Sequence, residues 1–190
     1  MTRSSRVPFA SLLVILTLSV AIGEAAFRVT ERGTSVWTAP SGGWEVLTRF
    51  EIRDMSKIKQ FLDDKPPEVD AARLYEVMAN EPGIWMGFSI RFGRVQRIVF
   101  TKSSKVVLID KAGNRFESDG CFFSPDVMQT RVYDSRKTNV VVSKKSVQRH
   151  PKHGLTMMDV KFPAGSFAAR DLIRFEIINV IEDTTQTSDN

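Results

Sequence analysis

Hydrophobic and polar residues alternate with a period of two along much of residues 44–181. The clearest run is residues 44–53, where Trp44, Val46, Phe50 and Ile52 alternate with charged residues. This period is typical of a strand with one face in water, so we expect the first strand here. Further strands are predicted at residues 85–92, 95–102, 105–110, 115–123, 130–134, 140–143, 155–162 and 172–181, with a hairpin turn at 111–114.

The pattern changes to a helical period over about residues 56–80. Ser56 can cap a short helix that places Ile58, Phe61 and Leu62 on one face. Pro67 suits the first turn of a second helix, and its apolar stripe is formed by Ala71, Leu74, Val77 and Met78. We expect these helices to be an insertion after the first strand.

Nine short strands, several of them apolar on both faces, predict two packed sheets. The expected fold class is mainly β, an immunoglobulin-like β-sandwich with a short two-helix insertion. A single domain would cover residues 44–182. Residues 25–43 are rich in small and polar residues and predict a linker or lead-in, and residues 183–190 predict a disordered tail.

The N-terminus has the order of a secretory signal: Arg3 and Arg6, an apolar run over residues 7–22, and then small residues. We expect a signal peptide at residues 1–24 and an exported protein, periplasmic or secreted. The alternative is an N-terminal membrane anchor that holds the domain outside the cytoplasm.

Cys121 is the only cysteine, so no intramolecular disulfide can form. Phe122 and Phe123 follow it directly, which favours burial of the thiol over pairing between chains.

The net charge of +5 is unevenly distributed. Residues 131–153 hold seven basic residues and the single acid Asp134. This segment predicts an anion-binding face, with candidates Arg136, Lys137, Lys144, Lys145, Arg149 and Lys152. The expected partners are an anionic envelope polymer, a lipid surface or an acidic protein. Location outside the cytoplasm, and the lack of aromatic residues apart from Tyr133, argue against nucleic acid. The alternative is an edge strand protected by lysines.

Catalytic and metal-binding motifs are not found in the sequence. His150 and His153 are separated by a proline that disfavours a helical pair of ligands, so we expect no metal and no cofactor. The nucleophile motif Gly-x-Ser-x-Gly and the Gly-rich phosphate loops are missing, so no catalytic residue is assigned. Trp37 is either a partner contact or an edge-strand residue packed on the core.

The leading functional hypothesis is a non-enzymatic binding or accessory protein of the cell envelope that binds an anionic partner through residues 131–153. One alternative is a hydrolytic enzyme with its site between the helical insertion and the sandwich. The other is a structural subunit of an envelope assembly that uses Trp37 or an exposed strand edge.

Overall fold

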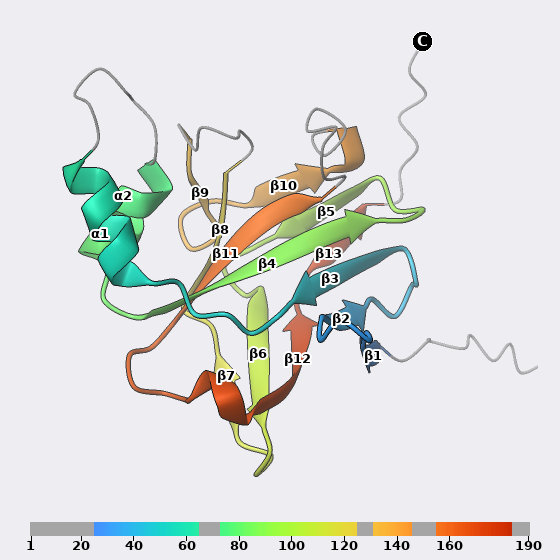
Figure 1. Ribbon diagram of the computed structural model, residues 1–190. Coiled ribbons are helices and arrows are strands. Elements are labelled where there is room, and N and C mark those ends of the chain that lie inside the picture. Colours follow the sequence, from blue (N-terminus) through green and yellow to red (C-terminus); the bar gives the residue numbers. More distant parts are fainter. Residues whose placement is uncertain (1–24, 65–72, 125–130, 146–154, 184–190) are drawn as a thin grey trace, which may run out of the picture.

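The computed structural model describes residues 25–64, 73–124, 131–145 and 155–183. The protein is mainly β, with antiparallel sheets and two α-helices (Figure 1). The elements before the fourth strand are β1 (Ala26–Val29), β2 (Ser35–Thr38), β3 (Trp44–Thr48), α1 (Met55–Asp63) and α2 (Arg73–Asn80). The middle of the chain forms β4 (Ile84–Phe92), β5 (Arg97–Phe100), β6 (Lys105–Asp110), β7 (Arg115–Glu117), β8 (Gly120–Phe123), β9 (Tyr133–Asp134) and β10 (Val140–Ser143). The last elements are β11 (Thr156–Phe162), a short 3₁₀ helix (Ala169–Asp171), β12 (Leu172–Ile178) and β13 (Ile181–Asp183).

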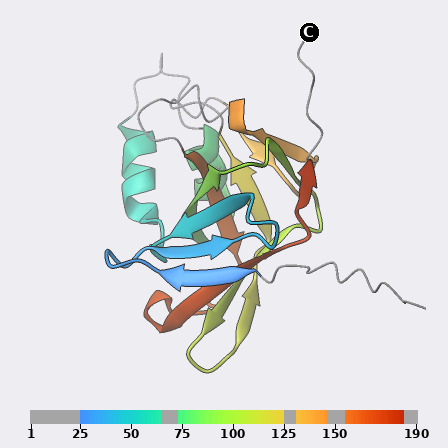
Figure 2. The same cartoon turned by 90° about the vertical axis from the view of Figure 1, so that its right-hand side faces the viewer.

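The strands form two layers. One layer is a seven-stranded sheet in the order β1-β2-β3-β4-β11-β8-β9. The other layer consists of two three-stranded sheets, β10-β5-β13 and β12-β6-β7 (Figures 1 and 2). The two small sheets are linked because β5 leads into β6 and β12 leads into β13. The bend between them lies at Asn179, which has φ 57° and bonds the backbone of Ser103 through its side-chain amide.

The main core lies between the two layers and includes Trp44, Phe88, Phe100 and Phe175. A second, smaller core joins the two helices to the outer face of the seven-stranded sheet, where Ile58, Leu74 and Met78 pack against Trp85 and Phe122. Strand β8 contributes side chains to both cores, because alternate side chains of a strand point to opposite faces of the sheet. Cys121 and Phe123 face the main core and Phe122 faces the helices, which confirms that Cys121 is buried.

Residues 26–38 were expected to lie in a linker, and this expectation is wrong. They form β1 and β2, which extend the seven-stranded sheet through pairing with each other and with β3. The two-helix insertion therefore follows the third strand, not the first. The polar composition misled the prediction because β1 is a mostly exposed strand at the edge of the sheet, where one side of its backbone needs no partner strand.

The strand expected at 115–123 is divided in two. Strand β7 pairs with β6 in one layer, and β8 pairs with β11 in the other. The chain crosses between layers at Ser118, whose hydroxyl accepts a hydrogen bond from the Val106 amide at 3.0 Å. Gly120 has φ 149°, which a glycine adopts without strain, and completes this corner.

Helix α1 is capped by Asp54 in place of Ser56, so it begins two residues earlier than a Ser56 cap implies. The Asp54 carboxylate accepts hydrogen bonds from the amides of Ser56 and Lys57. The predicted signal peptide and residues 184–190 of the predicted tail lie outside the described residues, while Asp183 belongs to β13. Among the helices that the structure describes, none is long and apolar enough to cross a membrane.

Candidate functional site

A two-residue bulge interrupts the pairing of β3 with β4. Leu47 pairs with Ser89, but the next bridge joins Ile52 to Met86, so the chain leaving β3 has two more residues than β4 between these points. This is why the strand expected at residues 44–53 ends at Thr48. Ile52, expected to face the core, is 45% exposed. Bulges of this kind redirect side chains and are frequent beside functional sites.

Phe50 holds the bulge in an uncommon conformation, with φ 56°. A bulky residue is strained at positive φ, and strain of this kind persists only where the surrounding structure imposes it. Here the Phe50 ring packs on the main core, with its centroid 6.0 Å from that of Phe175. The Thr48 hydroxyl supports the bulge by accepting a hydrogen bond from the Phe50 amide and donating one to the Gly87 carbonyl.

An open groove of about 530 Å³ lies beside the bulge on the outer face of the seven-stranded sheet. Leu47, Ser89 and Met157 form one row across β3, β4 and β11, and Gly87 lies in the next row of β4. The hollow exists because the central strand has small residues here, while larger side chains stand on both sides. The lining comprises Thr34, Leu47, Thr48, Arg49, Glu51, Ile52, Arg53, Asp54, Gly87, Ser89, Leu155 and Met157.

One end of the groove contains a close arginine–aspartate pair. The Nε and Nη2 atoms of Arg53 lie 2.8 and 2.7 Å from Oδ1 of Asp159. Asp159 is only 4% exposed, whereas the Arg53 side chain is 37% exposed. Burial raises the pKa of Asp159, and the charge and hydrogen bond of Arg53 oppose this rise. A Cβ atom at Gly87 would lie 2.6 Å from Arg53 Nη2, so a larger residue here would displace the end of the Arg53 side chain.

The rest of the groove combines apolar walls with polar groups that have few internal partners. Ile52 and Met157 are 45% and 47% exposed. Arg49 donates one long hydrogen bond, 3.5 Å, to the Thr34 hydroxyl and forms no ion pair within the described part of the chain. Glu51 likewise makes no side-chain contact of this kind with another described residue. The groove can therefore offer an external ligand both a donor and an acceptor above an apolar surface.

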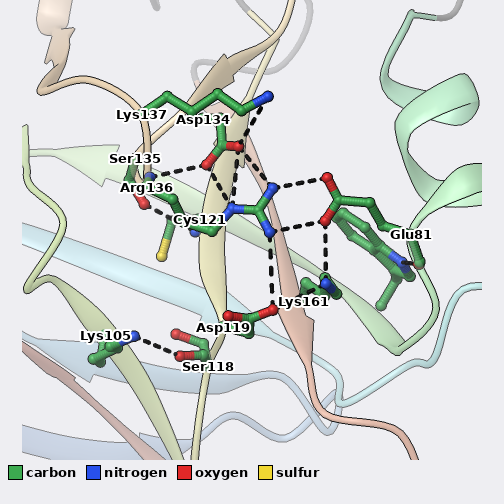
Figure 3. Close-up of polar contacts among 11 residues, drawn as sticks. Glu81, Lys105, Ser118, Asp119, Cys121, Asp134, Ser135, Arg136, Lys137 and Lys161 are labelled. Atoms are coloured by element: carbon green, nitrogen blue, oxygen red, sulfur yellow. Dashed lines mark hydrogen bonds and ion pairs between the residues drawn. The ribbon is translucent and has the colours of Figure 1, made fainter.

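Arg136, a predicted anion-binding residue, is bound by the protein itself (Figure 3). Its guanidinium contacts the carboxylates of Asp134 at 2.7 Å, Glu81 at 2.8 Å and Asp119 at 3.8 Å. Lys161 completes this Arg136 cluster, with Nζ 3.1 Å from Glu81 and 2.9 Å from Asp119. The Arg136 guanidinium also lies 4.7 Å from the centre of the Phe122 ring.

The charges of the Arg136 cluster support one another. The hydrogen bond from Arg136 lowers the pKa of Glu81 to about 2. The bond to Asp134 raises the pKa of Arg136 further above its usual range. Burial alone would lower the pKa of Lys161, but its bonds to Asp119 and Glu81 outweigh burial and raise it. The cluster joins the loop after α2 to β8, β9 and β11, and the guanidinium of its arginine is engaged by three carboxylates of the protein.

The other predicted basic residues that the structure describes lie at opposite ends of β10. Lys137 is 77% exposed and lies before β10, whereas Lys144 and Lys145 follow it. A four-residue strand separates the two groups by about 13 Å. Lys144 donates to the Gly93 carbonyl at 2.9 Å. Arg149 and Lys152 lie outside the described residues.

Trp37 lies in the main core and is 4% exposed, in edge-to-face contact with Trp44. The packing alternative for this residue is therefore confirmed, and a surface contact through its ring is wrong. Within the described ranges, no three histidine, cysteine or acidic residues lie close enough to hold a metal ion. His150 and His153 fall outside these ranges.

The chain matches no protein-family model, and comparisons with curated proteins and with solved structures found no significant similarity. The groove is therefore characterised by its own geometry. The sequence contained one signal for it: Gly87 and Ser89 interrupt an otherwise apolar strand, and glycine within a strand often marks the close approach of another group.

Proposed function

We propose that this protein is an exported, non-enzymatic binding protein whose groove beside the β3 bulge receives a ligand with an apolar part and a polar group. The observation that carries the proposal is the strained Phe50. Its ring is held in the core while its neighbours Arg49 and Glu51 line a hollow above Gly87 and Ser89. Strain at Phe50 beside a hollow lined by exposed charged side chains favours a functional site over a defect of packing.

The dimensions of the groove support this proposal. A volume of about 530 Å³ falls within the range of small-molecule sites. Such sites combine apolar walls with a few polar groups that orient the ligand. Here Leu47, Ile52 and Met157 would contact the apolar part, and Arg49 would bind the polar group.

The hydrolytic alternative has less support at this groove. Asp159 is occupied by Arg53, and Asp54 caps α1. Glu51 is then the only acid lining the described groove that is not engaged in either way. One carboxylate without a neighbouring nucleophile or base does not form the arrangement that hydrolysis requires.

Two expectations stay predictions. The two-layer packing supports a sandwich, and the immunoglobulin-like form of it is the more specific prediction. Anion binding by residues 131–153 now depends on Lys137, Lys144, Lys145, Arg149 and Lys152, because Arg136 is occupied by carboxylates.

Binding of anilinonaphthalene sulfonate, an aromatic probe with one anionic group, tests the groove. We expect saturable binding to the wild-type protein and at least a tenfold loss in Ser89→Trp, because the indole fills the space above β4. Thr138→Trp is the matched control, since Thr138 is exposed in the turn before β10. It should bind as the wild type does.

A second variant tests the polar end without filling the groove. Arg49→Gln should weaken binding of the probe about fivefold, because it removes a charged donor at an exposed position where folding is not affected. Equal binding by the wild type, Ser89→Trp and Arg49→Gln would show that the probe binds elsewhere and would overturn the proposal.

A further inference from the structure

The outer face of the sheet β10-β5-β13 carries an exposed apolar row. Val141 on β10 and Ile181 on β13 are both paired with Val99 on β5, so the three side chains lie side by side. Val141 is 59% exposed and Ile181 is 56% exposed, while the alternate residues Val142 and Ile98 face the core. Because Val141 and Ile181 are each more than half exposed, no part of the described chain covers these two side chains.

Basic residues surround this row. In the next row of the same face, Arg97 lies between Ser143 and Asp183, and it pairs with Asp183 at 2.7 Å. Lys144 and Lys145 follow β10, and the exposed Lys102 follows β5. The remaining acid of β13, Glu182, is bonded to Ser41 and Trp44. The face therefore combines apolar side chains with an excess of positive charge at its border.

The first described strand begins on the side of this face. Strand β1 begins at Ala26, which pairs with Thr38. The turn that follows Thr38 contacts β13 through the Ser41 hydroxyl, which donates to Glu182 at 2.8 Å. The start of β1 and strand β13 lie toward the same side in both views (Figures 1 and 2). Only three residues lie between Ile22, the end of the apolar run, and Ala26, a reach of about 14 Å at most.

We infer that the apolar row Val141–Val99–Ile181, with its basic border, is a docking face for an anionic lipid membrane. Exposed apolar side chains insert among the headgroups, and lysines and arginines are attracted to anionic lipids. A retained N-terminal anchor would hold this face at the membrane surface and raise its effective concentration there. A processed chain would bind the same surface reversibly through the face alone. This inference does not depend on the groove, which lies on the other layer of the protein.

Vesicle binding by a chain that begins at Ala25 tests the face without the apolar segment. All the strands and both cores lie within residues 26–183, so this chain keeps the fold. We expect binding to phosphatidylglycerol vesicles, weaker binding to phosphatidylcholine vesicles, and a loss of binding as salt is raised. The double variant Val141→Ser, Ile181→Ser should bind about tenfold more weakly. Ile173→Ser is the control, because Ile173 is 45% exposed on β12 in the other small sheet.

A fluorescent label reports the orientation directly. Cys121 is fully buried, so a cysteine introduced on the surface can be labelled selectively with a nitrobenzoxadiazole dye. On addition of phosphatidylglycerol vesicles, the emission of the dye should shift to the blue in Ile181→Cys and remain unchanged in Ile173→Cys. Either no binding to the vesicles, or equal shifts at both positions, would overturn the docking face. The docking face would also be overturned if this surface bound a protein and did not bind the vesicles.

Discussion

The groove and the Arg136 cluster lie on the outer face of the same seven-stranded sheet, and both are organised by arginine–carboxylate pairs. In the Arg136 cluster each charged group meets an opposite charge of the protein, and no strained residue is involved. In the groove, Arg53 is paired, but Arg49 and Glu51 form no ion pair with another described residue, and Phe50 is strained between them. The paired charges of the Arg136 cluster hold the loop after α2 against the seven-stranded sheet. In the groove, exposed charges beside a strained residue are the basis of the proposed binding site.

Loss of Arg136 should produce the largest effect. Arg136→Gln is expected to lower the free energy of unfolding by about 3 kcal/mol, because Asp134, which is 8% exposed, loses its charged partner in a nearly buried position. Denaturant unfolding measures the change. Lys137→Gln is the matched control, because Lys137 is 77% exposed and 3.9 Å from Asp134, and its change should stay within about 0.5 kcal/mol. Similar changes in unfolding free energy for both variants would mean that the Arg136 cluster does not stabilise the fold.

Loss of Arg53 should have a smaller effect and should also alter the groove. Arg53→Met leaves Asp159 buried without its partner and is expected to cost about 2 kcal/mol of unfolding free energy. Arg91→Met, which removes an exposed pair with Glu45 at 3.2 Å, should cost less than about 1 kcal/mol. If Arg53→Met kept both its stability and its affinity for anilinonaphthalene sulfonate, the Arg53–Asp159 pair would have no part in shaping the groove.

The contributions of the two regions to stability should change in opposite directions as the pH falls. This is the smallest effect of the three predictions. Because Glu81 has its pKa lowered from 4.5 to about 2, the unfolded chain takes up its proton first, and stability from this residue is lost as pH falls from about 4.5 toward 2. Burial raises the pKa of Asp159, so the folded protein takes up that proton first and gains stability as pH falls.

Variants separate these two contributions. Unfolding free energies between pH 7 and pH 2.5 should fall less steeply in Glu81→Gln than in the wild type, and more steeply in Asp159→Asn, about 1 kcal/mol in each case. Parallel profiles for the two variants would contradict the contrast between the Arg136 cluster and the groove.

Local patterns in the sequence predicted most strands within the described residues, because alternation and apolar runs report burial directly. The strands at residues 105–110 and 140–143 agree with the structure residue for residue. The errors occur where the chain departs from a regular ladder. The bulge at Phe50, the corner at Ser118 and the strands β1 and β2 all depend on pairing with residues elsewhere in the chain.

The candidate sites were less predictable than the fold. The excess of basic residues in 131–153 is real, but the sequence could not show that Arg136 would meet Glu81, which is 55 residues away. Nor could it show that Arg53 would cross Gly87 to reach Asp159, 106 residues away. A charge count records which groups exist, and their availability depends on what surrounds them after folding.

The sequence by itself determined that the chain forms a mainly β protein with a short helical insertion, and that Cys121 is buried without a disulfide. These properties follow from local periodicity, turn residues and composition. The tertiary structure alone decided which charges are paired, where a strand breaks, and which apolar side chains stay in water. Long-range pairing sets all three, because a side chain's surroundings are made of residues that its own neighbours along the chain do not specify.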